Sequence, residues 1–339
     1  MWLTGTSSAT GHRLLATGYW PPATGYRPLA TGHWLPATGH RPPATYTIRN
    51  VKPLAITLGD PAGIGPEIVD KALAELDIPA RVFGKVPGGV RYGEIAAEYG
   101  RVALDAIDAA IAAIERGECS ALVTAPIHKQ SIALAGSPFP GHTELLAARA
   151  GLERYAYDYA MYFDSPRLRI VLLSVHVPLR TAIDSIHAED IAALARLTSR
   201  EYAKLHGGAP RIAVAGVNPH AGEGGRFGDE ETEIARGVEL ARRDGLAVTG
   251  PHPPDTVFLA ATAGKCDVVM AMYHDQGLIP MKTLAFHESV NVTLGLPWLR
   301  VSVDHGTAFD IAGRGIADAG PMKYAIRWAA EHARRAVGG

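Results

Sequence analysis

Cysteine is scarce in this sequence, because Cys119 and Cys266 are the only two in 339 residues. Neither belongs to a Cys-x-x-Cys pair, and both border apolar runs, which predicts two buried thiols, no disulfide and a reducing compartment. The chain also lacks any run close to the roughly 20 apolar residues that a membrane span requires. We therefore expect a protein of the cytoplasm that is not embedded in a membrane.

An excess of charge of either sign is absent as well. The sequence holds 33 basic and 34 acidic residues, a formal net charge of -1, so there is no electrostatic reason to expect binding to nucleic acid or to an anionic membrane. Hydrophobic residues make up 47% and charged residues 20%, as in ordinary globular proteins. The length favours two lobes, and the expected partners are small molecules or a second copy of the chain.

Residues 1–50 differ from the rest of the chain. The triplet Ala-Thr-Gly starts at Ala9, Ala16, Ala23, Ala30 and Ala37, which defines a seven-residue repeat. A glycine in every unit and prolines in most units argue against a coiled coil, and the prolines also argue against the amphipathic helix of a transit peptide. We interpret the segment as a disordered extension, translated from a tandem DNA repeat, with the functional protein beginning near Val51.

Three apolar runs, each too short for a buried helix, are followed by a histidine. Residues 169–175 precede His176, 211–217 precede Asn218, Pro219 and His220, and 268–272 precede Tyr273 and His274. Such runs are typical of parallel strands covered on both faces, whose carboxyl ends collect ligands. Any one histidine alone is more often structural, but the repeated pattern predicts that all three lie along one sheet edge and bind a divalent metal.

Two strand-like segments in the first half of the chain precede Lys129. The strand-like residues 54–58 lead into a glycine-rich turn and a helix, which is a βα unit, although the turn alone is weak evidence for phosphate binding. Residues 121–124 form a short buried strand that ends shortly before Lys129. Lys129 is therefore a candidate charged contact, with a solvated lysine as the alternative.

Further candidates lie at turns and helix starts. His142 and Thr143 begin a helix, where free backbone N–H groups attract anions, although Thr143 also suits a plain N-cap. Asp255 is either a cap or a carboxylate turned toward the metal. Arg300, at the end of the strand-like residues 290–300, could form paired hydrogen bonds with a phosphate or carboxylate, with a surface arginine as the alternative.

Seven motifs in order resemble a known family. They are G-D-P-A-G-I-G-P-E, T-A-P-I-H-K, G-H-T-E, V-N-P-H-A-G-E-G-G, Y-H-D-Q-G, V-N-V-T-L-G-L-P and S-V-D-H-G-T-A-F-D-I-A-G. Together they resemble the 4-hydroxythreonine-4-phosphate dehydrogenase family of pyridoxal phosphate biosynthesis, from Leu54 to the end of the chain. The seven-residue repeat departs from that family, but no motif does.

The first and last motifs also resemble the isocitrate and isopropylmalate dehydrogenase group. That resemblance implies an α/β fold, with a three-layer α/β/α two-domain subunit, and a homodimer whose active site is completed by the neighbouring subunit. The first α/β domain would comprise residues 51–136 with 304–339. The second, residues 137–303, would carry the metal ligands and the dimer interface.

The resemblance also implies roles for individual residues. His176, His220 and His274 would bind the metal (Zn, Mg, Mn or Co), shared between subunits, with Asp255 nearby. The substrate-binding positions would be His142, Thr143, Lys282, Asn291 and Arg300. By the same resemblance, NAD or NADP would bind at Asp304, His305, Gly306, Asp310 and Gly313, rather than on a G-x-G-x-x-G turn, which the chain lacks. Lys129 and Asp255 are both candidates for the catalytic proton acceptor.

The reaction implied is oxidation of 4-phosphooxy-L-threonine by NAD(P)⁺. The product, 2-amino-3-oxo-4-phosphooxybutanoate, would lose CO₂ to give 3-amino-2-oxopropyl phosphate. The nearest alternative is a paralogue acting on 4-phospho-threonate or phospho-erythronate, which would keep the metal, phosphate and nicotinamide sites. A zinc hydrolase and a non-catalytic dimeric binding protein are the more distant alternatives.

Overall fold

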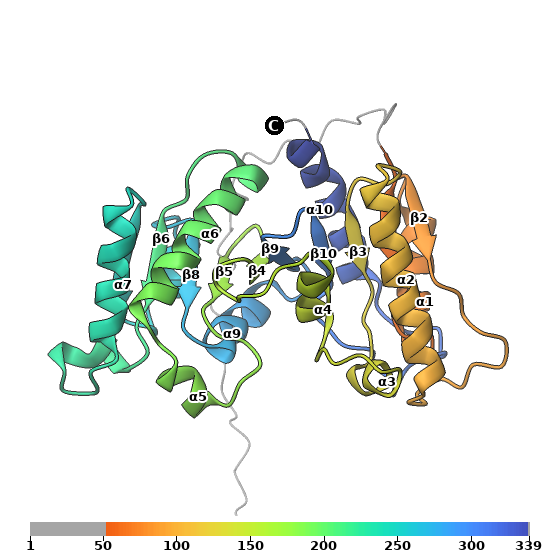
Figure 1. Cartoon of the computed structure of the whole chain (residues 1–339), viewed down its shortest axis with the longest axis horizontal. Helices are drawn as coiled ribbons and strands as arrows, with labels where there is room; N and C mark the ends of the chain where they lie inside the picture. The colour runs from red at the N-terminus through yellow and green to blue at the C-terminus, as the bar shows by residue number, and fades with distance from the viewer. Residues whose placement is uncertain (1–51, 338–339) are drawn as a thin grey trace, which may run out of the picture. The chain divides into compact units, whose positions relative to one another are not determined.

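The computed structural model describes residues 52–337, and the predicted extension of residues 1–50 lies outside them. Ten strands form one continuous sheet, in the order β2-β1-β3-β10-β9-β4-β5-β8-β6-β7 (Figure 1). The strands are β1 (Leu54–Thr57), β2 (Ala80–Phe83), β3 (Leu122–Thr124), β4 (Ala160–Asp164), β5 (Arg169–Leu172), β6 (Ile212–Ala215), β7 (Val248–His252), β8 (Val268–Ala271), β9 (Val290–Leu294) and β10 (Arg300–Ser302).

The sheet consists of two parallel halves joined by antiparallel pairs. Strands β2, β1, β3 and β10 are parallel to one another, as are β5, β8, β6 and β7. The two central strands β9 and β4 pair antiparallel with their neighbours. Neighbouring strands twist by about 20–25°, or roughly 100–125° over the five steps from β3 to β8. Because three antiparallel pairs separate the two halves, β3 and β8 run in opposite directions along the sheet, and the accumulated twist turns their carboxyl ends toward the same side. The helices that follow β3 and β8 lie on that side of the molecule in Figure 1.

One face of the sheet carries a single continuous core. Apolar side chains of α1, α10, α6 and α7 pack there on alternate residues of the strands. The helices of the described residues are α1 (Gly65–Glu75), α2 (Ala97–Glu115), α3 (Lys129–Leu134), α4 (His142–Arg149), α5 (Leu179–Asp184), α6 (Ala188–His206), the 3₁₀ helix η1 (Pro219–Gly224), α7 (Glu231–Arg243), α8 (Val257–Thr262), α9 (His274–Ala285) and α10 (Gly320–Val337).

The opposite face carries two separate cores. Helices α2, α3 and α4 pack over β1 and β3, whereas α8 and α9 pack over β4, β5, β6 and β8. Between them the side chains on this face are polar, because β9 and β10 alternate. Val292 and Val301 belong to the continuous core, so their neighbours Asn291, Arg300 and Ser302 point to the other face. This polar stripe belongs to neither of the two cores.

The predicted α/β class with helices on both faces of the sheet is confirmed. The strands predicted within residues 169–175, 211–217 and 268–272 are also confirmed to within a few residues. Residues 52–337 fall within one compact unit by their contacts. The boundaries proposed for two domains stay a prediction.

The strand predicted over residues 290–300 is wrong in its extent. The chain forms two antiparallel strands, β9 and β10, with Val292 opposite Val301. Gly295 lies between them with a φ of 88°. A Cβ atom there would lie 1.9 Å from the carbonyl oxygen of Asp158, so only glycine permits the reversal.

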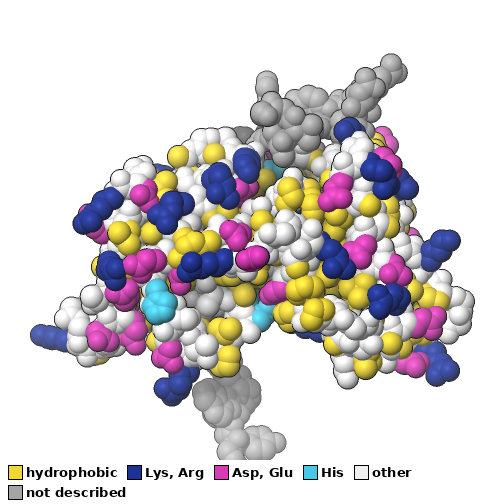
Figure 2. Space-filling model, viewed as in Figure 1, with side chains coloured by type: hydrophobic (Ala, Val, Ile, Leu, Met, Phe, Trp, Pro, Cys, Tyr) yellow, Lys and Arg dark blue, Asp and Glu magenta, His cyan; other side chains and the backbone are white. Residues whose placement is uncertain are grey.

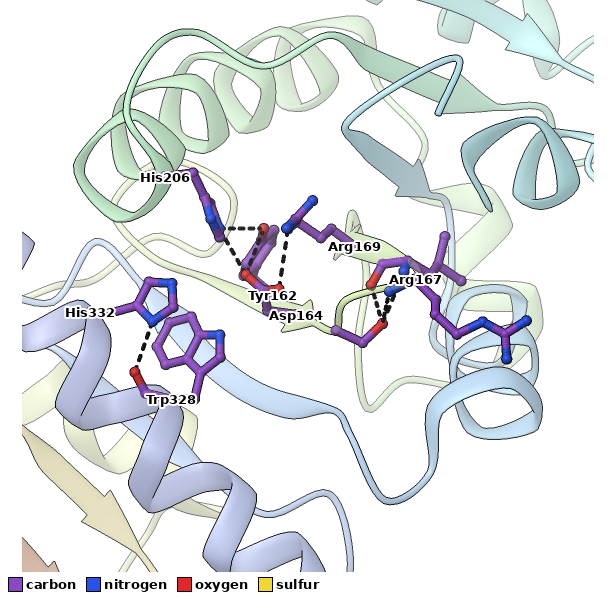
Figure 3. A network of polar contacts seen from close by, with 9 residues as sticks. Tyr162, Asp164, Arg167, Arg169, His206, Trp328 and His332 are labelled. Carbon is purple, nitrogen blue, oxygen red and sulfur yellow. Dashed lines mark hydrogen bonds and ion pairs between the residues drawn. The ribbon is translucent and has the colours of Figure 1, made fainter. Parts of the chain in front are cut away.

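A buried polar network lies on the continuous-core face of β4 (Figure 3). The Asp164 carboxylate accepts a hydrogen bond from Arg169 Nε at 3.2 Å and lies 2.8 Å from His206 Nε2. The hydroxyl of Tyr162 is 3.4 Å from both His206 Nε2 and Asp164 Oδ2. His206 ends α6, so the network attaches that helix to the centre of the sheet.

Glu67 connects α1 with the segment before α10. Its carboxylate accepts hydrogen bonds from the backbone N–H groups of Ala317 (2.8 Å) and Gly315 (3.2 Å) and from Lys71 Nζ (2.7 Å). Burial alone would raise the pKa of Glu67, but these hydrogen bonds lower it overall. The ionised carboxylate thus holds residues 315–317 against α1.

Among residues 52–337 we find no helix with the length and apolar character needed to cross a membrane. On the face shown in Figure 2, basic and acidic side chains are interspersed, without a large area of one sign.

We expect Glu67→Gln to lower the free energy of unfolding by about 1–3 kcal/mol, since backbone hydrogen bonds to a charged group contribute on that order. The matched control is Glu75→Gln in the same helix, whose side chain is 60% exposed and pairs with Lys323. An exposed pair of this kind contributes about 0–1 kcal/mol. Urea unfolding of both variants measures the difference. Equal effects would show that Glu67 does not hold the segment.

Candidate functional site

A cavity of about 350 Å³ lies over the polar stripe, between the two cores. Its lining includes eleven of the fifteen candidate residues from the sequence, namely Lys129, His142, Thr143, His176, His274, Lys282, Asn291, Arg300, Asp304, His305 and Gly306. The cavity thus gathers side chains from β9, β10, α4, α9 and the loops after β3 and β5. It contains three cationic side chains, Lys129, Lys282 and Arg300, as expected of a site for an anionic ligand.

Arg300 forms part of the cavity floor and is 1% exposed. Its guanidinium donates hydrogen bonds to Thr124 Oγ1 (2.9 Å) and Thr293 Oγ1 (3.1 Å). No carboxylate among residues 52–337 lies within ion-pair distance of it. Burial lowers the pKa of Arg300 to about 9, so the side chain remains charged at neutral pH. A buried cation without an anionic partner is costly, and a bound anion would remove that cost.

Buried polar atoms without a hydrogen-bond partner concentrate at this cavity. Among residues 52–337 there are eleven such side-chain atoms, and five belong to cavity residues: His142 Nε2, Glu144 Oε2, Asn291 Oδ1, Arg300 Nε and Asp304 Oδ2. Native proteins leave few buried polar groups unpaired. The concentration indicates that a polar ligand completes these contacts.

The first turn of α4 forms one wall. Gly141 is the N-cap and makes no side-chain cap hydrogen bond, so the backbone N–H groups of the first turn are available to an anion. The interpretation of Thr143 as a plain N-cap is therefore wrong. Burial, with a smaller effect of Arg300, keeps the pKa of His142 well below its usual value, so its imidazole is neutral.

Asp304, His305 and Gly306 line the cavity beside Lys282. Lys282 Nζ donates a hydrogen bond to the Asp304 carbonyl oxygen at 3.3 Å and lies 3.8 Å from its carboxylate. Burial nevertheless raises the pKa of Asp304 to about 6, against a smaller opposing effect of Lys282. Burial also lowers the pKa of His305.

Asp310 and Gly313, the other two predicted cofactor positions, do not line the cavity. Asp310 is exposed. Gly313 has a φ of 74°, and a Cβ atom there would lie 2.2 Å from the Tyr92 ring. The backbone conformation and the close packing therefore explain the glycine at position 313 by themselves, without a role in cofactor binding.

His176 and His274 follow β5 and β8, neighbours in the sheet, and their ring centroids are 5.6 Å apart. The Nδ1 atom of His274 lies 2.7 Å from Asp275 Oδ1, and that of His176 lies 3.8 Å from Glu144 Oε1. A carboxylate at Nδ1 leaves Nε2 as the atom available to a metal. The pair fits two ligands of a divalent metal. Among residues 52–337, no group of three or more His, Cys, Asp or Glu side chains could hold one within a single chain.

His220 and Asp255 lie outside the cavity of their own chain. His220 follows β6, beside β8, as predicted from the sequence, but it is exposed and its ring faces Phe227 at 6.4 Å between centroids. Asp255 is exposed in the turn before α8. A single chain therefore brings together two of the three predicted metal ligands. Their sharing between subunits stays a prediction.

Two contributions to the site were missed in the sequence. Glu144 lines the cavity beside His176, and its place in the G-H-T-E motif, in the first turn of a helix, was an available signal. Thr124 and Thr293 orient Arg300, and only their alternation with buried apolar residues could have indicated this.

Comparisons with known proteins show the family to which the chain belongs. The family described as "Pyridoxal phosphate biosynthetic protein PdxA" matches residues 50–329. A Beijerinckia indica protein named 4-hydroxythreonine-4-phosphate dehydrogenase is 42% identical over 320 residues, 82% of this chain and 94% of that protein. A D-threonate 4-phosphate dehydrogenase of Salmonella typhimurium is 39% identical over 324 residues, 82% of this chain and 98% of its own.

The crystal structure of a 4-hydroxythreonine-4-phosphate dehydrogenase from Klebsiella pneumoniae superposes with a TM-score of 0.74 at 38% identity. It covers 84% of this chain and 100% of the other. The fold and the relatives thus place the chain among proteins named as dehydrogenases. It belongs to the PdxA family of pyridoxal phosphate biosynthetic proteins, which confirms the resemblance in the sequence.

Asp304→Asn should remove a pH dependence of stability. Because the pKa of Asp304 is raised from 3.8 to about 6 in the folded protein, the folded state binds more protons than the unfolded state between these values. Stability therefore falls as pH rises from about 4 to about 6. The variant should lack this decline and exceed the wild type by up to roughly 3 kcal/mol at pH 7. Urea unfolding across this range measures it, with exposed Asp310→Asn as control. Parallel curves for wild type and Asp304→Asn would contradict the assignment.

Arg300→Met should weaken binding of inorganic phosphate by roughly tenfold or more, since a charge-assisted hydrogen bond contributes about 1.5–3 kcal/mol. The ligand-free protein should keep its stability, because the change removes a buried charge that has no carboxylate partner. The phosphate-dependent rise in melting temperature measures the binding. Arg91→Met is the control, since that side chain is 80% exposed. An equal rise in both variants would exclude Arg300 from the anion site.

Proposed function

We propose that this chain is a metal-dependent, NAD(P)-linked 4-hydroxythreonine-4-phosphate dehydrogenase. It would oxidise the C3 hydroxyl of 4-phosphooxy-L-threonine to a ketone, with hydride transfer to NAD(P)⁺ and release of one proton. The 2-amino-3-oxo-4-phosphooxybutanoate formed would lose CO₂ to give 3-amino-2-oxopropyl phosphate, in pyridoxal 5'-phosphate biosynthesis. The observation that carries the proposal is the cationic cavity, with buried Arg300 at its floor and a histidine pair at its wall.

The substrate phosphate is assigned to Arg300, Lys282 and the first turn of α4. Arg300 supplies a charge that has no carboxylate partner, and Lys282 supplies a second charge from α9. His142 and Thr143 contribute the start of α4, where backbone N–H groups favour an anion. Anchoring of the phosphate by rigid elements holds the reacting carbon in place.

Lys129 is the proposed proton acceptor in this reaction. It lines the cavity at the start of α3, whereas Asp255 is exposed and outside the cavity of the same chain. Asp255 would act only on the site of a second subunit. Between the two predicted candidates, the geometry of the single chain favours Lys129.

His176 and His274 would hold the divalent metal, with His220 contributed by a second copy of the chain in a homodimer. The metal would supply a Lewis acid that lowers the pKa of the substrate hydroxyl. Glu144 and Asp275 keep the two imidazoles oriented through their Nδ1 atoms.

The nicotinamide cofactor is assigned to the loop after β10. Asp304, His305 and Gly306 line the cavity. Gly63 in the glycine-rich turn packs on this loop, where a Cβ atom would lie 3.0 Å from Thr307. NAD or NADP as the cofactor, Zn, Mg, Mn or Co as the metal, and a cytoplasmic location stay predictions.

A second candidate is a D-threonate 4-phosphate dehydrogenase, because relatives of that name are 39% identical over 82% of the chain. That substrate carries a hydroxyl where 4-phosphooxy-L-threonine carries an ammonium group. The names of the relatives favour both dehydrogenases over a hydrolase or a non-catalytic binding protein.

The purified protein should form NAD(P)H with 4-phosphooxy-L-threonine at a kcat/KM at least roughly tenfold above that with 4-phospho-D-threonate, equivalent to ~1.4 kcal/mol of discrimination. Prior chelation by EDTA should abolish both activities, and Co²⁺ or Zn²⁺ should restore them. Absorbance of the reduced nicotinamide measures the rates. The reverse preference would establish the second candidate, and activity unaffected by EDTA would refute the metal-dependent mechanism.

A further inference from the structure

Gln276 bridges the ends of two neighbouring strands. Its side-chain Oε1 accepts a hydrogen bond from the Met272 backbone N–H at 2.7 Å, just after β8. Its Nε2 donates to the Gly216 carbonyl oxygen at 2.8 Å, just after β6. The side chain is 8% exposed, so both bonds form away from water, where unpaired groups would be costly. The bridge links the start of α9, which carries His274, to the loop that carries His220.

Glu231 holds the next two residues of that loop. Its Oε1 accepts hydrogen bonds from the backbone N–H groups of Val217 (2.9 Å) and Asn218 (2.8 Å). The Asn218 side-chain amide donates to Glu231 Oε2 at 2.9 Å and to Glu230 Oε2 at 2.6 Å. Three consecutive residues, 216–218, are therefore fixed by the side chains of two other elements.

The segment that follows has an unfavourable backbone conformation. His220, Ala221 and Glu223 have φ values of 53°, 53° and 45°. Left-handed conformations cost about 1–2 kcal/mol for each residue with a Cβ atom. Such strain persists only where surrounding structure enforces it, and it clusters at functional sites. Here the left-handed segment presents His220 at the surface, outside the cavity of its own chain.

We infer that Gln276 and Glu231 are positioning residues that fix His220 relative to His274, so that His220 can complete the metal site of a second copy. The inference rests on the proposed function, since it assigns His220 to a metal. Neither residue lines the cavity, so both would act through the backbone segments that they hold and not by contact with a ligand. The Gln276 bridge thus connects His274, which would bind the metal in the site of its own subunit, to His220, which would bind the metal in the site of the other subunit.

The test uses the full-length protein, freed of metal by EDTA and titrated with Co²⁺ by calorimetry. Gln276→Glu places a carboxylate oxygen against the Gly216 carbonyl oxygen and should lower Co²⁺ affinity by 10- to 100-fold, as loss of residues that orient metal ligands does. Asn218→Ala, which removes only side-chain hydrogen bonds, should cause a smaller loss in the same direction. The matched control is Glu239→Gln in α7, whose carboxylate is 53% exposed and pairs with Arg243.

A double-mutant cycle separates positioning from general stabilisation. If Gln276 acts through His220, Gln276→Glu should cause no further loss of Co²⁺ affinity in the His220→Ala protein. A lower melting temperature of the metal-free variants with unchanged Co²⁺ affinity would overturn the inference and leave the proposed function intact. A wild-type protein that binds no Co²⁺ would instead refute the proposed metal site, and the inference with it.

Discussion

The burial of Arg300 in the middle of the sheet is the constraint on which the site depends. Removing a guanidinium from water costs several kcal/mol unless an anion compensates, and two threonine hydroxyls provide hydrogen bonds without charge. Among the groups around it, His142 is kept neutral by burial, and Glu144 offsets the effect of burial on Arg300 only in part and from beyond ion-pair distance. The folded chain therefore holds a cation in place before its ligand arrives, which is the preorganisation expected of an anion site.

The cavity follows from how helices cover the sheet. An apolar helix face cannot pack on Asn291, Arg300 and Ser302 without burying unpaired polar groups, so the helices on this face divide into two cores on either side. On the opposite face the alternate residues are apolar, and one core spans the whole sheet. The same two strands thus close one side of the protein and leave the other open for a ligand.

The strand-then-histidine pattern could be read from the sequence because parallel strands buried on both faces are continuous apolar runs. The features that were missed depend on distant contacts. Gly277 lies within α9, where a Cβ atom would lie 2.6 Å from a Leu172 methyl group, so glycine lets the helix approach β5. The orientation of His220 is likewise set by Glu231 and Gln276, which periodicity does not reveal.

The separation of His220 from the other two histidines is informative about the assembly. Three residues of the loop, His220, Ala221 and Glu223, have left-handed conformations, which persist only where the surrounding structure enforces them. Hydrogen bonds from Gln276 and Glu231 fix the residues just before them, Gly216 and Asn218. At the same sheet edge, His176 and His274 lie together with carboxylates at their Nδ1 atoms and no third protein ligand among residues 52–337. Under the proposed function, an outward-facing His220 of one copy would complete the pair of His176 and His274 in another copy. Each fold alone would then maintain only part of the proposed centre.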